Sequence, residues 1–179
     1  MRASTARTCE RPGTLGAVVV GRSGFPEGDP DERELLLQWL GYLRGAVLRK
    51  SDGIDDVQAR WRPDGKLISL IGIVNHLTNV EWRWIDGGFR GTAAVQREEA
   101  EFHPPDELTI TAAREAYERR AAETDAFIRS ADLVLRSGGG TWAEGHDLRF
   151  VTLHLINETA RHAGHADAVR ELLDGTVGE

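Results

Sequence analysis

The sequence has a single cysteine among its 179 residues. One cysteine cannot form an intrachain disulfide, so the fold has to depend on an ordinary hydrophobic core. Such a chain suits a reducing compartment, and we expect a cytoplasmic location. Because Cys9 lies in a segment without regular periodicity, its position argues against a catalytic thiol.

Long hydrophobic runs and an excess of basic residues are also absent. No apolar run approaches the roughly 20 residues that a bilayer-spanning helix needs. The apolar run 15–20 is too short for a secretory signal and is flanked by glycine and arginine. The net charge of −7 argues against a nucleic-acid binder, which would show a basic face. We therefore expect neither a membrane nor a nucleic-acid partner.

The composition changes after residue 30. Residues 1–30 are rich in Gly, Pro, Ser, Thr and Arg, which predicts a poorly ordered N-terminal extension. A mis-assigned start codon would explain such a leader equally well. Residues 31–179 have the size of one domain and can bury a proper core.

Four segments in this domain show the three- and four-residue apolar spacing of amphipathic helices. Asp31 and Ser69 are predicted N-caps, and Gly87 and Gly175 follow predicted helix ends. The predicted helices span residues 31–50, 69–86, 109–130 and 148–174, with a short helical turn at 55–60. With no convincing strand, the sequence predicts an all-α, four-helix bundle. Long connections after the second and third helices permit topologies other than simple up-down.

The last predicted helix carries polar groups where core leucines would be expected. At about 100° per residue, one of its faces comprises Val151, His154, Leu155, Glu158, His162, His165, Val169, Leu172 and Leu173. Burying imidazoles and a carboxylate without partners costs several kcal/mol. Either a metal ion satisfies these groups, or they hydrogen-bond one another or face a wet groove.

A metal centre needs ligands that can meet. Glu158 and His162 lie four residues apart, so their side chains project about 6 Å apart from one helix face. His76, on the second helix, would complete a set of two imidazoles and one carboxylate. This set suits one divalent ion, first Zn²⁺ and alternatively Ni²⁺ or Fe²⁺. Three ligands rather than four indicate a catalytic site with an open position.

Other polar residues on or beside this helix face give weaker indications of a role. His165 is a candidate catalytic base, fourth ligand or support for a ligand, and His154 is expected to be a hydrogen-bonded flank residue. Arg161 and Asn157 border the same helix face. They either hold an anionic substrate or are surface residues without a functional role. Arg120 on the third helix is expected to be solvated surface.

The tryptophans have two interpretations as well. They either line a pocket or, as is commoner at helical spacing, belong to the core. The residues concerned are Trp61, Trp82, Trp84 and Trp142.

The residues of this constellation resemble the DinB-like (YfiT-like) superfamily. The resemblance rests on His76-Leu in the second helix, on Glu81 and Trp84 after it, and on the run Asn157-Glu-Thr-Ala-Arg-His-Ala-Gly-His-Ala-Asp167. It extends from about residue 31 to 175 and is nearest to the branch with the E-T-A-R-H-A-G-H signature. Related members are mycothiol-dependent and bacillithiol-dependent enzymes.

The resemblance implies a bundle in which His76, Glu158 and His162 hold a divalent metal. Glu158 stands where the commoner pattern has a third histidine, which leaves the metal's identity open. A His–Glu–His set is similar to that of mycothiol-dependent maleylpyruvate isomerases. Relatives often pair their bundles, so a homodimer is one expectation, although no residue identifies its surface.

Three hypotheses of function stay open. The first is a metal-dependent S-transferase or isomerase that adds a low-molecular-weight, mycothiol-like thiol to an electrophilic small molecule, with the metal lowering the pKa of the thiol. The second is a metal-dependent hydrolase in which the same ion activates water. The third is a non-catalytic bundle that binds a metal or small ligand in stress response. The sequence names neither the thiol nor the electrophile.

Overall fold

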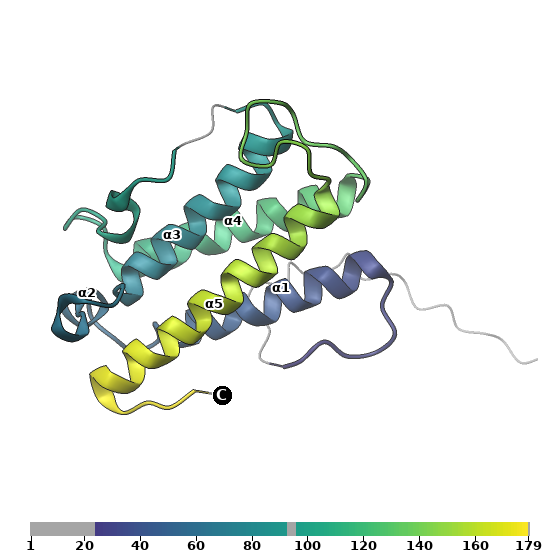
Figure 1. Cartoon of the computed structure of the whole chain (residues 1–179). Helices are drawn as coiled ribbons and strands as arrows, with labels where there is room; N and C mark the ends of the chain where they lie inside the picture. Colours follow the sequence, from purple (N-terminus) through teal and green to yellow (C-terminus); the bar gives the residue numbers. More distant parts are fainter. Residues whose placement is uncertain (1–23, 93–95, 179) are drawn as a thin grey trace, which may run out of the picture.

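The computed structural model describes residues 24–92 and 96–178, and four long helices form most of this part of the chain (Figure 1). They are α1 (Glu32–Arg49), α3 (Leu70–Trp82), α4 (Ile110–Ser130) and α5 (Leu148–Asp174). Shorter elements are α2 (Asp56–Arg60), η1 (Pro63–Gly65), η2 (Arg83–Gly87) and η3 (Glu99–Phe102). The described residues contain no strand, so the predicted all-α bundle is confirmed.

The helices begin where polar caps are available. The side chains of Asp31, Ser69, Thr109 and Asp147 each accept a hydrogen bond from a backbone N–H in the first turn of α1, α3, α4 and α5. At the other end of α5, Gly175 adopts φ +79°, a left-handed conformation that costs glycine little. These bounds agree closely with the predicted ones.

The second predicted helix differs at its end. Regular α-helix stops at Trp82, and the chain continues as the π-helical turn η2 before Gly88. Wider turns of this kind often occur at functional sites. Here the turn carries Arg83 and Trp84 to the cavity described below.

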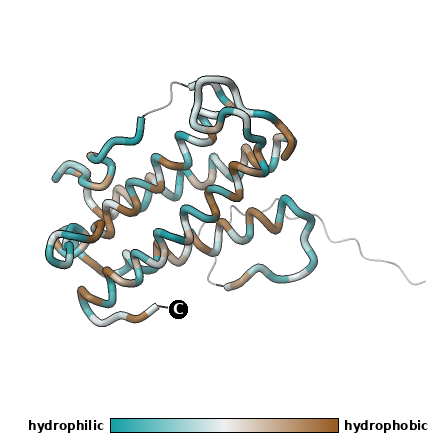
Figure 2. Tube along the Cα trace, in the orientation of Figure 1, coloured by the Kyte–Doolittle hydropathy of each residue, from teal (hydrophilic) through white to brown (hydrophobic). Residues whose placement is uncertain are grey.

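In the bundle, α1 packs along α5, and α3 packs against both α4 and α5. Hydrophobic and hydrophilic residues alternate along each long helix (Figure 2). The apolar side chains form two clusters: one contains Leu40, Ile128 and Leu155, and the other contains Val47, Ile73 and Val169. Since both clusters take residues from the long helices, each helix crosses from one to the other. The residues between the clusters form a polar layer across the middle of the bundle.

One part of that layer is a buried ion cluster on α1, α3 and α4. The Arg44 guanidinium donates two hydrogen bonds of 2.8 Å to Glu81 and one of 2.7 Å to Asp125. Burial alone would lower the pKa of Arg44, but the charges of Glu81 and Asp125 outweigh it and raise the pKa. Burial, together with Glu81, raises the pKa of Tyr117 beside them. The cluster therefore joins three helices through paired charges.

The prediction for Arg120 was wrong. Its side chain is buried, and it pairs with Asp86 of η2 and with Glu123 on its own helix. The pairing ties α4 to η2.

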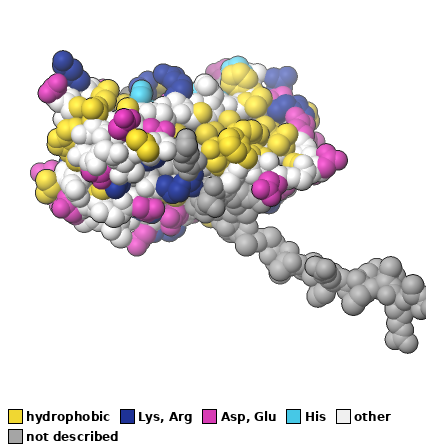
Figure 3. All heavy atoms as spheres, turned by 90° about the horizontal axis from the view of Figure 1, so that it is seen from below, with side chains coloured by type: hydrophobic (Ala, Val, Ile, Leu, Met, Phe, Trp, Pro, Cys, Tyr) yellow, Lys and Arg dark blue, Asp and Glu magenta, His cyan; other side chains and the backbone are white. Residues whose placement is uncertain are grey.

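Hydrophobic side chains gather on one face of the molecule (Figure 3). Leu35 and Trp39 of α1 are partly exposed, and the ring of Phe25 stacks on Tyr42 with a centroid distance of 4.8 Å. Most of the predicted N-terminal extension, including Cys9, lies outside the described residues. None of the described helices is both long and apolar enough to cross a bilayer.

Candidate metal centre

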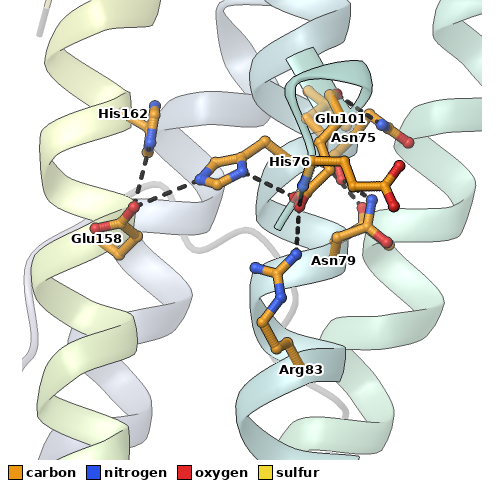
Figure 4. Close-up of polar contacts among 10 residues, drawn as sticks. Asn75, His76, Asn79, Arg83, Glu101, Glu158 and His162 are labelled. Atoms are coloured by element: carbon orange, nitrogen blue, oxygen red, sulfur yellow. Dashed lines mark hydrogen bonds and ion pairs between the residues drawn. The ribbon is translucent and has the colours of Figure 1, made fainter. Parts of the chain in front are cut away.

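The other part of the polar layer contains the three predicted metal ligands. His76 comes from α3, and Glu158 and His162 come from successive turns of α5 (Figure 4). Glu158 Oε1 lies 3.4 Å from His76 Nε2 and 3.5 Å from His162 Nε2. One potential ligand atom from each residue lies within 4.8 Å of the others. The two histidines are buried, and Glu158 is partly exposed.

A second carboxylate, Glu101, fixes the His76 ring from behind. Its Oε2 lies 3.1 Å from His76 Nδ1, and its Oε1 pairs with Arg83 (Figure 4). The Asn75 side chain donates a 2.8 Å hydrogen bond to the Glu101 backbone carbonyl. Phe102 covers one face of the imidazole, with a centroid distance of 4.4 Å. The His76 ring is thus held on several sides with Nε2 directed toward Glu158.

These contacts constrain the protons on His76. An ionised carboxylate only accepts hydrogen bonds, so Nδ1–H donates to Glu101. In the neutral imidazole Nε2 then carries a lone pair, and this lone pair faces the Glu158 carboxylate. Two acceptors at 3.4 Å need a positive group between them. Either a proton on Nε2 or a metal ion fills that role.

The donor set fits a metal ion. Ligand atoms about 2.1 Å from a tetrahedral Zn²⁺ lie about 3.4 Å apart, close to the two separations between Glu158 and the imidazoles. The neighbouring imidazoles of His162 and then His76 lower the pKa of Glu158 far below its usual value, so the carboxylate is ionised. A His ligand whose second nitrogen donates to a carboxylate is a recurrent arrangement at metal sites, and His76 with Glu101 has this form.

A cavity of about 170 Å³ opens directly beside His76 and Glu158. Its other lining residues are Val80, Arg83, Trp84, Arg97, Trp142, His154 and Arg161. A small molecule in this cavity would contact two of the three candidate ligands. Among the tryptophans considered for a pocket, Trp84 and Trp142 line it, whereas Trp61 packs against the hydrophobic core.

The remaining histidines occupy different environments. His165 is exposed, its ring centroid lies 5.4 Å from that of His162, and it is not among the residues that line the cavity. Partial burial and then the charge of His162 lower its pKa. His154 lines the cavity and packs on Trp84 with a centroid distance of 4.1 Å, and burial lowers its pKa. His103 is exposed, and His146 stacks on Phe150.

Glu101 was not identified from the sequence. It lies on η3, within a connection that has little hydrophobic periodicity, so no pattern marked it as inward-facing. One local signal was the glycine at position 72 in the first turn of α3. A Cβ at Gly72 would collide with the carbonyl oxygen of Phe102, so the missing side chain lets η3 approach α3 closely enough for Glu101 to reach His76.

Comparison with known families agrees with this geometry. A family model described as mycothiol-S-transferase matches residues 35–175. The matched range contains the three candidate ligands, Glu101 and the cavity. No curated protein matches the chain.

Proposed function

We propose that this chain, which belongs to the mycothiol-S-transferase family, transfers a mycothiol-like thiol to a small electrophile in a metal-dependent reaction. The observation that carries the proposal is the convergence of His76, Glu158 and His162 beside a small cavity. We propose Zn²⁺ as the metal, with Ni²⁺ and Fe²⁺ as alternatives, because two imidazoles and one carboxylate suit all three. When bound, such an ion would lower the pKa of a coordinating thiol.

The protein's own residues would position the reactants. Glu101 holds His76 so that Nε2 points at the centre, and Trp84 and Trp142 shape the cavity for the electrophile. The thiol loses its proton, its sulfur forms a bond to the electrophilic carbon, and the carbon releases a leaving group or passes an electron pair to its neighbour. We assign the proton to His165, because its exposed imidazole lies beside His162 and can return the proton to water.

The test uses purified protein loaded with Zn²⁺, mycothiol and dimethyl fumarate, with the thioether product measured by mass spectrometry. We expect His76→Ala and Glu158→Ala to abolish metal binding and to reduce product formation to the uncatalysed rate. His103→Ala is the matched control, because its imidazole is exposed and His103 is not among the residues that line the cavity. An unaltered rate in either ligand variant would overturn the assignment.

Two other outcomes would replace the proposal. Thiol-independent cleavage of an ester or amide would indicate a hydrolase. Full metal occupancy without turnover over a broad panel of electrophiles would indicate a binding protein.

We also propose a cytoplasmic location and a homodimer. The single cysteine supports the first. Sedimentation of the purified protein tests the second, and a monomer at all concentrations would contradict it.

A further inference from the structure

Three arginines meet at the cavity beside the candidate metal centre. Arg83 comes from η2, Arg97 from the connection that leads to η3, and Arg161 from α5. Among the described residues that line this cavity, Glu158 is the only carboxylate. Cationic side chains that come from separate segments and face one small space are suited to an anionic ligand.

The three cations are not equally available. Arg83 is paired with Glu101. Arg161 lies 3.8 Å from Glu158 Oε2, a carboxylate whose charge a divalent ion would offset. Arg97 makes no ion pair with a described residue and lies 5.3 Å from the centroid of the Phe102 ring. With a divalent ion on Glu158, Arg97 and Arg161 are the cations left to pair with a ligand.

The walls and the size of the cavity further restrict the kind of ligand that fits. The indoles of Trp84 and Trp142 offer apolar faces, and the Arg83 guanidinium lies 5.8 Å from the Trp142 ring centroid. The volume of about 170 Å³ is below the roughly 300–1,000 Å³ that is usual for drug-sized ligands. A small, flat molecule with one charged end fits both observations.

We infer that this cavity binds a small anionic electrophile, an unsaturated carboxylate, and that Arg161 and Arg97 pair with its carboxylate group. The electrophilic character of the ligand and the release of Arg161 from Glu158 rest on the proposed metal-dependent function, whereas the excess of cations belongs to the cavity lining itself. Mycothiol carries no carboxylate or phosphate, so the anionic group belongs to the electrophile. The thiolate sulfur bonds to one alkene carbon, the alkene electron pair moves to the other, and that carbon takes up a proton. The addition needs no oxidant or reductant.

The first test measures binding without reaction. Calorimetry compares monomethyl succinate, an unreactive anion, with dimethyl succinate, its neutral partner, on the Zn²⁺-loaded protein. We expect the anion to bind more tightly, and Arg161→Gln or Arg97→Gln to weaken its binding by about tenfold, as loss of a charge-assisted hydrogen bond predicts. The matched control is Arg119→Gln, because Arg119 and Arg161 side chains are both 68% exposed and each has an acidic partner 3.8 Å away on its own helix.

The second test compares rates of mycothiol addition to monomethyl and dimethyl fumarate, each divided by its uncatalysed rate. Selective loss of the monomethyl ester reaction in Arg161→Gln supports the inference. Equal binding of the two succinates, or an equal effect of Arg119→Gln and Arg161→Gln, overturns it. If the anion binds selectively but neither fumarate reacts, the proposed function fails while the anion site stands.

Discussion

Replacing Glu101 should weaken metal binding although Glu101 is not itself a predicted ligand. Its two carboxylate oxygens have separate partners, with Oε2 accepting from His76 and Oε1 from Arg83. An amide has only one oxygen, so in Glu101→Gln one of these two donors faces an NH₂ group. Glu101→Ala removes both acceptors and frees the imidazole to rotate.

The expected loss of metal affinity follows from what such supporting carboxylates contribute at other metal sites. Loss of a partner behind a metal-binding histidine costs about 10–100-fold in metal affinity, or about 1.4–2.8 kcal/mol. We expect about tenfold weaker Zn²⁺ binding in Glu101→Gln and about a hundredfold in Glu101→Ala.

Competition with a chromogenic chelator measures these affinities. The matched control is Glu99→Gln on the same short helix, since the Glu99 side chain is 85% exposed and its Oε1 lies 3.6 Å from His103 Nε2. Urea unfolding of the metal-free variants checks that the bundle is intact. Wild-type Zn²⁺ affinity in both folded Glu101 variants would refute the assigned role of this carboxylate.

Three further predictions concern the surroundings of the candidate metal centre and the buried ion cluster. His165→Gln should retain the metal but slow thiol transfer by about 10²-fold, as loss of a general base does. If His154→Gln slows thiol transfer while His165→Gln reacts at the wild-type rate, the base is His154 instead. Arg44→Met should lower the free energy of unfolding by about 3–5 kcal/mol, because it leaves Glu81 buried without its cation, and unchanged urea unfolding would contradict this. Gly72→Ala should push η3 away from α3 and reduce Zn²⁺ affinity in the chelator assay, whereas a wild-type affinity would show that η3 is not held by this contact.

The sequence was informative wherever the physics is local. Helix starts depend on one side chain and the next three residues, so Asp31 and Ser69 marked them directly. The glycine at 175 marked the end of α5 for the same reason. Glu158 and His162 were paired from spacing alone, because a helix places residues four apart on the same face.

Contacts between distant segments were harder to predict. The approach of Glu101 to His76 depends on how an aperiodic connection folds over α3, and Gly72 leaves room for that approach without specifying it. Arg120 resembled any charged residue on an amphipathic helix, yet η2 brings Asp86 over it and removes it from water. His165 lies three residues after His162, which places it about 60° around the helix. There it is exposed, whereas Ala166, the next residue along the chain, is buried.

We propose that the polar layer holds a metal ion rather than a shared proton. Metal analysis of protein purified without metal-affinity resin tests it most directly, with wild type, His162→Ala and the exposed control His103→Ala compared. We expect one divalent ion per chain in wild type and in His103→Ala, and none in His162→Ala. Wild-type protein without metal, which also takes up neither Zn²⁺ nor Ni²⁺ when they are added, would contradict it and leave His76, Glu158 and His162 as a proton-sharing cluster.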